Sequence, residues 1–152
     1  YAQLATQVQQ VIPLSKLYGR PVRILSSFRV YAATLPVAAA NATVEGQIAV
    51  DGSEAFRAWY VLHNMAALTF SWNVRLGATG NLLFNQALSG LLVPALGSVR
   101  DGTGANVFPF GPGGIIFAPR NTVAFVVTDT SGAGFAVGAM FGLVGESFVP
   151  PR

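Results

Sequence analysis

The sequence contains no cysteine and few charged residues. Of its 152 residues, nine are Lys or Arg and six are Asp or Glu, so charged residues make up 10%, against roughly 25% in ordinary soluble domains. Without cysteine, neither a disulfide framework nor a thiolate metal site can form. So little charge excludes a disordered tail, a charged coiled coil and a polybasic nucleic-acid-binding module.

Residues suited to catalysis are equally scarce. His63 is the only histidine, and no second His or Cys completes a zinc-binding set with it. No G-x-S-x-G sequence supplies a serine nucleophile. Asp51 and Asp101 each precede a glycine, and turn formation explains both aspartates better than a pair of glycosidase carboxylates does. We therefore predict a protein that is not an enzyme and that holds no cofactor or metal ion.

The net charge of +3 is not gathered into a basic patch. The eight Arg and Lys16 are scattered along the chain, so no basic run could neutralise several phosphates. Long uncharged stretches occur, but Pro, Gly or Asn interrupts each before it reaches the ~20 consecutive apolar residues of a membrane-spanning helix. The sequence thus predicts no specific nucleic-acid partner and no membrane span.

The sequence is rich in apolar residues, glycine and proline. Hydrophobic residues make up 52%, beside 17 Gly and nine Pro. From Leu68 to Leu76, apolar and polar residues alternate with a period of two, which is typical of a strand with one buried face. Turn dipeptides such as Asp51-Gly52 separate further short apolar runs. The strands we predict are Val22–Tyr31, Gln47–Val50, Ala55–His63, Leu68–Leu76, Thr122–Asp129 and Gly134–Val144, the last two forming a hairpin across Ser131-Gly132.

The number and spacing of these strands indicate the fold class. Gly and Pro are dense over Leu82–Pro119, where they favour connections between strands over helices. With the short apolar runs between these turns, the total is about seven or eight short strands at ~8–12-residue spacing. This indicates an all-β fold, an antiparallel β-sandwich that is either a plain sandwich or a jelly roll. We assign residues 21–152 to this domain and residues 1–20 to an N-terminal arm.

The N-terminal arm differs in character from the domain. It is rich in Gln, and four of its apolar residues are spaced like one face of a short helix that Pro13 would end. These candidate interface residues are Leu4, Val8, Val11 and Ile12. A helix this short needs a neighbouring surface to be stable. That surface is either another subunit, on which we expect the arm to dock, or the arm's own domain.

Two glycines and a tryptophan complete the candidate interface. On a strand over Gly134–Val144, Gly138 and Gly142 share a face that carries little bulk, and glycine inside a strand is costly unless something approaches closely. We predict that another element or a neighbouring subunit packs over them; a strand bend or bulge is the alternative. The candidate Trp59 lies in the opposite pleat to Phe56, Tyr60 and Leu62. An aromatic side chain there could fill an interface or stack on a sugar.

The segment from Glu45 to Phe148 resembles a known group of proteins. The first features that carry the resemblance are Glu54-Ala55-Phe56-Arg57 and the alternating strand. They are followed by residues 81–87 (NLLFNQA), by Pro109-Phe110, by residues 116–123 (IFAPRNTV) and by an apolar strand. In this order of features the segment resembles the small β-sandwich structural proteins of tailed-bacteriophage particles. The resemblance covers about two thirds of the chain. It implies a component that decorates the capsid, forms a fibre or collar, or belongs to the tail.

Composition and resemblance together predict a non-enzymatic structural protein of a bacteriophage virion. Protomers whose surfaces are covered by neighbours can be poor in charge. We therefore expect a homo-oligomer that also contacts other virion structural proteins. The alternative is a carbohydrate- or receptor-binding β-sandwich module, which an exposed aromatic platform near Asn and Asp would favour.

Overall fold

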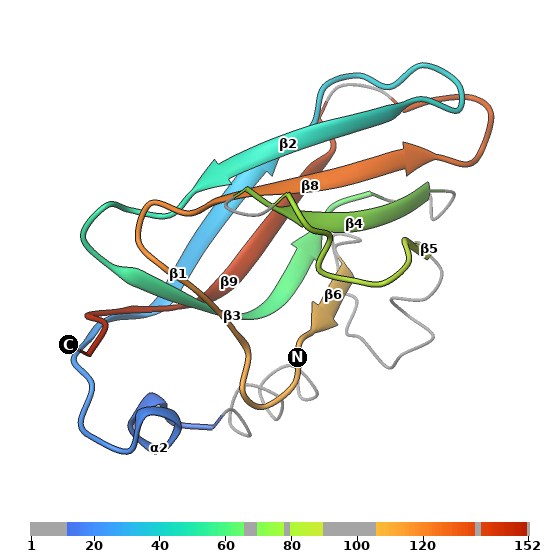
Figure 1. Ribbon diagram of the computed structural model, residues 1–152. Coiled ribbons are helices and arrows are strands. Elements are labelled where there is room, and N and C mark those ends of the chain that lie inside the picture. The colour runs from blue at the N-terminus through green and yellow to red at the C-terminus, as the bar shows by residue number, and fades with distance from the viewer. Residues whose placement is uncertain (1–11, 66–69, 78–79, 90–105, 136–137, 152) are drawn as a thin grey trace.

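The computed structural model describes residues 12–65, 70–77, 80–89, 106–135 and 138–151 (Figure 1). Its elements are α2 (Leu14–Tyr18), β1 (Ile24–Thr34), β2 (Thr43–Ala49), β3 (Ala55–His63), β4 (Phe70–Leu76), β5 (Leu88–Ser89), β6 (Asn106–Pro109), β7 (Ile115–Phe117), β8 (Thr122–Asp129) and β9 (Met140–Phe148). The predicted strands over 55–63 and 122–129 have the observed bounds. The alternating strand is confirmed from Phe70 onward, because residues 66–69 lie outside the described part of the chain.

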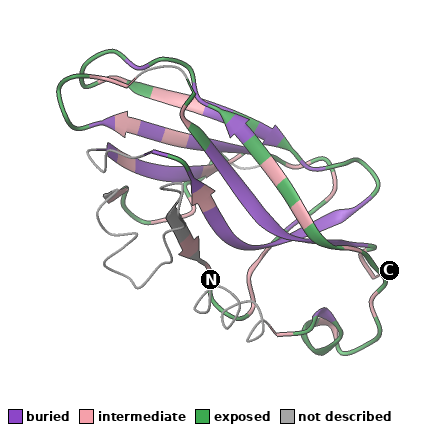
Figure 2. Ribbon diagram, turned by 180° about the vertical axis from the view of Figure 1, so that it is seen from behind, coloured by how far each residue is buried: buried purple, intermediate pink, exposed green. Residues whose placement is uncertain are grey.

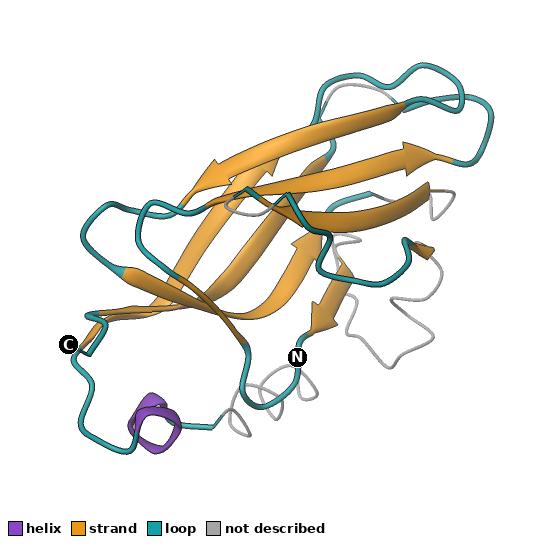
Figure 3. Cartoon of the chain, viewed as in Figure 1, coloured by secondary structure: helices purple, strands orange, loops and turns teal. Residues whose placement is uncertain are grey.

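The strands form two antiparallel sheets that pack face to face (Figures 1 and 3). The larger sheet has the order β1-β9-β3-β6, with β7 also pairing with β3, and the smaller sheet has the order β2-β8-β4-β5. The pairs nest along the chain, β1 with β9, β2 with β8, β3 with β6 and β4 with β5, as in a long hairpin rolled up on itself. This nesting is the strand order of a jelly roll. The all-β antiparallel sandwich predicted from the sequence is confirmed.

The core between the sheets is built from large aromatic residues. Phe141 of β9 lies at its centre, with its ring centroid 5.4 Å from that of Phe125, 5.7 Å from that of Trp72 and 6.0 Å from that of Phe70. Trp72 and Phe125 are completely buried. The inward residues of β4 are Phe70, Trp72 and Val74, which is the alternation that the sequence predicts.

The predicted C-terminal hairpin is wrong. Strand β9 begins only at Met140, and β8 and β9 belong to different sheets. Gly138 lies before β9 with a φ of 104°, a left-handed conformation that favours glycine. Gly134 has a φ of 73°, and a Cβ there would collide with the carbonyl oxygen of Ala38. These two glycines belong to the crossing between the sheets, whereas the sequence pattern assigned them to a return strand.

Asp129, the last residue of β8, organises the crossing. Its carboxylate accepts hydrogen bonds from the backbone N–H groups of Ser131 (3.0 Å), Gly132 (3.2 Å) and Gly134 (3.0 Å). It also accepts from the Ser131 hydroxyl (2.6 Å) and from the N–H of Asn41 (2.9 Å) in the loop before β2. These donors stabilise the ionised form, the Ser131 hydroxyl most of all, and hold the pKa of Asp129 well below its ordinary value. One side chain thus joins two loops at this end of the sandwich.

We expect Asp129 to make the fold sensitive to acid. A carboxyl whose pKa is depressed in the folded state stabilises the fold fully above its unfolded pKa of about 3.9, and this stabilisation is lost as the pH falls towards the folded-state pKa. In urea unfolding between about pH 6 and about pH 3, Asp129→Asn should be less stable than wild type at the higher pH and should lose less stability on acidification. Glu45→Gln serves as the control, because Glu45 forms a partly exposed ion pair with Arg75. Equal pH dependence of wild type and Asp129→Asn would contradict this role.

Candidate assembly surface

The outer faces of the two sheets differ in chemistry. On the four-stranded sheet the outward side chains are mainly polar: Glu45 of β2 pairs with Arg75 of β4, and the hydroxyls of Thr43 and Thr128 lie 2.7 Å apart. A sheet face of this kind suits contact with water. On the five-stranded sheet the outward residues alternate with core residues and are largely apolar. They include Val30 and Ala32 of β1, Leu62 of β3, and Met140 and Val144 of β9.

The exposed part of this outer face lies along β1. Among the strands that the structure describes, β1 lies at the edge of its sheet and pairs with β9 alone. Phe28 is 64% exposed and Val30 48% exposed, whereas β9 beside them is buried almost throughout (Figure 2). We call Phe28, Val30, Ala32 and Met140 the apolar face. Exposed apolar side chains on a sheet edge favour association with another surface.

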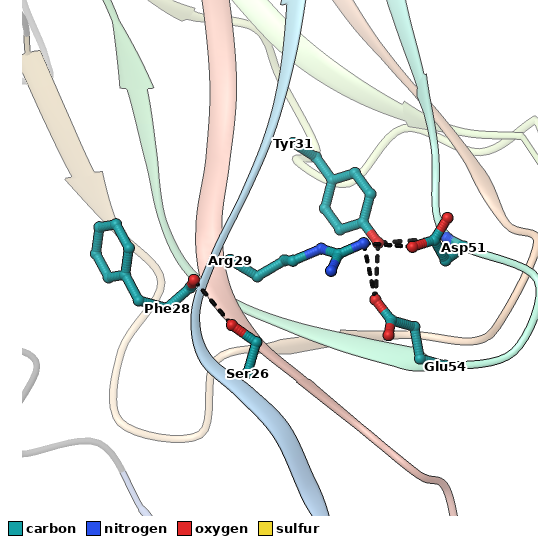
Figure 4. A network of polar contacts seen from close by, with 6 residues as sticks. All are labelled: Ser26, Phe28, Arg29, Tyr31, Asp51 and Glu54. Carbon is teal, nitrogen blue, oxygen red and sulfur yellow. Dashed lines mark hydrogen bonds and ion pairs between the residues drawn. The ribbon is translucent and has the colours of Figure 1, made fainter.

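A polar network neutralises the charge beside the apolar face. Arg29 forms ion pairs with Asp51 and with Glu54 (3.1 Å), and its guanidinium lies 5.4 Å from the centre of the Tyr31 ring. The Tyr31 hydroxyl donates to Glu54 (3.4 Å) and accepts from the backbone N–H of Asp51 (3.3 Å). Figure 4 shows this network on one side of β1 and Phe28 on the other. Arg29 therefore brings no unpaired charge to the apolar face.

Strand β1 is irregular where Phe28 lies. The register between β1 and β9 shifts on both sides of Ser26, and the Ser26 hydroxyl donates to the Phe28 carbonyl at 3.0 Å (Figure 4). Bulges of this kind re-aim side chains at sheet edges. Sequence reasoning missed Phe28 as an interface residue. The available signal was its spacing of two from Val30, which places both side chains on one face of the strand.

Helix α2 covers another part of the same outer face. Leu14 is 3% exposed and packs with Ala55 and Phe148, and the Tyr18 ring lies 5.8 Å from that of Phe148. The helix begins directly after Pro13, where the sequence had predicted only the end of an earlier helix. This part of the N-terminal segment therefore packs on its own domain, which is one of the two outcomes left open by the sequence.

A buried ion pair holds Ile12, two residues before the start of this helix. Arg57 of β3 is 2% exposed and pairs with Glu146 of β9, which is 8% exposed. Arg57 also donates to the carbonyl of Ile12, whose own N–H donates to the Pro112 carbonyl at 2.6 Å. Ile12, a predicted interface residue, is thus half-buried against its own domain. The other three candidates in the arm, Leu4, Val8 and Val11, lie outside the described residues.

Trp59 is not an exposed aromatic platform. It is 8% exposed and packs with Tyr60 and Val144. The predicted alternation along β3 fails here, because Ala58 pairs with Gly145 and Tyr60 with Val144, so Trp59 is the extra residue of a bulge. Tyr60 therefore packs with Trp59 and Val144 on the outer face of the sheet. Burial there raises the pKa of its hydroxyl.

The two candidate glycines have different surroundings. A Cβ on Gly142 would lie 3.2 Å from the carbonyl oxygen of Tyr31, so the element that approaches Gly142 is the neighbouring strand β1 of the same chain. Within the described residues, nothing lies within 4 Å of a Cβ built on Gly138. For Gly142, packing of a neighbouring subunit over the strand stays a prediction. For Gly138, the prediction assumed a position inside a strand, but Gly138 lies before β9.

Neither a metal-binding cluster nor a membrane-spanning helix occurs in the described part of the chain. No group of three His, Asp or Glu residues there could hold a metal ion. No helix in those ranges has the length and hydropathy needed to cross a bilayer.

Comparisons with known proteins find similarity only among solved structures. No protein-family model matches the sequence, and no curated protein does. Murine APRIL matches with a TM-score of 0.36 at 10% identity, covering 77% of this chain and 99% of that one. The structure of infectious bursal disease virus Gx strain matches with a TM-score of 0.30 at 14% identity, covering 80% of this chain and 31% of the viral one. The β-porphyranase BpGH86A from Bacteroides plebeius matches with a TM-score of 0.32 at 12% identity, covering 82% of this chain and 21% of the enzyme. These superpositions are too loose to define a shared fold.

Proposed function

We propose that this chain is a structural subunit of a virus particle, specifically of a bacteriophage, and that it acts by assembly and not by catalysis. The observation that carries the proposal is the contrast between the two outer faces. One is polar and suited to water, and the other exposes Phe28, Val30 and Met140 at the sheet edge. Exposed apolar patches of this kind mark interaction sites.

Two further features support assembly. Charged residues make up only 10% of the chain, which leaves little polar surface for a free monomer. The jelly-roll strand order is common in viral capsid domains, and the sequence resembles structural proteins of tailed-phage particles. Within the particle, the proposed roles are capsid decoration or a part of a fibre, collar or tail.

The alternative of a carbohydrate- or receptor-binding module has less support. Jelly rolls also occur among lectins, but sugar stacking needs an exposed aromatic ring. Trp59 and Trp72 are both buried. The exposed aromatic ring that the described residues do offer, Phe28, lies at the edge of the apolar face.

Sedimentation velocity tests the proposal. We expect the purified wild-type protein to sediment as an oligomer of the 15.9 kDa chain. Val30→Glu should shift it towards monomer, because a buried unpaired carboxylate is costly. Gln47→Glu is the matched control, since it adds the same charge to the polar outer face of the other sheet. A wild-type protein that remains monomeric at all concentrations would contradict the proposal.

A further inference from the structure

A second apolar feature lies at the opposite edge of the five-stranded sheet. Strand β7 pairs with β3 on the side away from β9, so β7 and β1 occupy opposite edges. A hollow of about 180 Å³ opens between β7 and the end of β4. Its lining residues carry no charge and are mostly apolar: Leu76, Gly77, Ile115, Ile116, Phe117, Asn121 and Thr122.

The hollow is built into the fold by close backbone packing. Gly77 donates its N–H to the Thr122 carbonyl at 2.8 Å, and a Cβ on Gly77 would collide with the Thr122 side chain. Glycine therefore lets the end of β4 approach the start of β8. Phe117 is buried, whereas Ile116 is 39% exposed. An apolar side chain of suitable size would cover apolar surface here that is now open to water.

Phe28 has the size and chemistry to fill this hollow in another copy of the chain. It is the most exposed large apolar residue in the described ranges. An apolar cavity of about 150 Å³ is large enough for benzene, so a hollow of about 180 Å³ has room for one phenyl ring. Charge also fits, because the hollow is uncharged and Arg29, the charged neighbour of Phe28, is paired with Asp51 and Glu54. A charged partner such as a nucleic acid would gain nothing from either surface.

We propose that Phe28 of one copy inserts into the hollow of the next copy. This contact specifies how the subunits meet, and it rests on the proposed function of assembly. Inserted side chain and hollow lie on different surfaces of each chain, so the contact is heterologous. A heterologous contact repeats from subunit to subunit and gives a ring if the rotation closes, or a filament if it does not. Each subunit in the assembly then contributes one Phe28 and one hollow.

Two variants separate the halves of this contact. Phe28→Ser removes the inserted ring and keeps the hollow, whereas Ile116→Lys places a charge beside the hollow and keeps Phe28. In sedimentation, the self-association of each variant alone should be weaker than that of wild type by a factor of about ten or more. Mixed in equal amounts, they should form a 1:1 dimer that grows no further, because one intact ring meets one intact hollow. Val37→Ser is the control, since Val37 is 60% exposed but belongs to neither surface.

The outcomes distinguish this contact from the proposed function. A wild-type protein that does not assemble would overturn both. Wild-type assembly that persists in Phe28→Ser or in Ile116→Lys would overturn the contact and leave the proposed function standing. Loss of assembly in both folded variants with no dimer on mixing would also overturn the contact. A far-ultraviolet circular dichroism spectrum like that of wild type shows that each variant keeps the fold, since loss of association alone lowers the unfolding temperature.

Discussion

Phe141→Ala should lower the free energy of unfolding by about 3–5 kcal/mol, the usual cost of deleting a buried phenylalanine ring. Phe141 is 1% exposed, and its ring packs against the rings of Trp72 and Phe125, which belong to the opposite, four-stranded sheet. Its removal leaves a cavity that strands fixed by their hydrogen-bonded pairing can close only in part. Because Trp72 and Phe125 both lose a partner, we expect this to be among the most costly truncations in the core.

Urea unfolding of Phe141→Ala and Met140→Ala compares the cost of truncating a core residue and a surface residue of the same strand. Met140 directly precedes Phe141 in β9 but points to the outer face and is 39% exposed. Its truncation should cost less than about 1 kcal/mol in the isolated chain, in keeping with substitutions away from the core. Similar costs for the two variants would show that β9 does not present alternate faces to core and surface.

Glu146→Ala is expected to destabilise the fold by about 3–5 kcal/mol, because it leaves Arg57 as a buried and uncompensated charge. Arg57 is 2% exposed, and its Nε atom is buried with no hydrogen-bond partner among the residues that the structure describes. The loss should also loosen the contact of Arg57 with the Ile12 carbonyl, and so the docking of the segment before α2.

Two comparisons isolate the charge effect. Glu45→Ala breaks a partly exposed pair with Arg75 and should cost at most about 1 kcal/mol. The double variant Arg57→Met with Glu146→Leu replaces the buried pair by apolar side chains and should recover most of the stability lost in Glu146→Ala. A double variant as unstable as Glu146→Ala would show that packing, and not the stranded charge, sets the cost.

The strands that alternate cleanly were predictable from the sequence. In β4, polar Ser71 and Arg75 separate the apolar residues, so the period of two identifies both the strand and its inward face. β9 was harder to place, because the run from Gly134 is apolar and glycine-rich on both sides of the true start at Met140. Periodicity does not distinguish a glycine needed for a turn from one inside a strand, and only the φ of 104° at Gly138 decides it.

The candidate site was less predictable, because it depends on non-local geometry. One extra residue at Trp59 changes which of its neighbours face the core, and nothing in the local pattern of β3 marks the bulge. Phe28 has the same hydrophobicity whether buried or exposed, and its exposure follows from β1 being an edge strand. The hollow joins residues of β4, β7 and β8, whose proximity follows from the order of strands in the two sheets.

The most direct test of assembly through the apolar face is a cryo-electron microscopy map of the assembled wild-type protein. We predict that a neighbouring subunit covers Phe28 and Val30, while the outer face of the four-stranded sheet, with Glu45 and Arg75, faces solvent. A map in which subunits meet through that polar face and leave Phe28 in solvent would contradict the account.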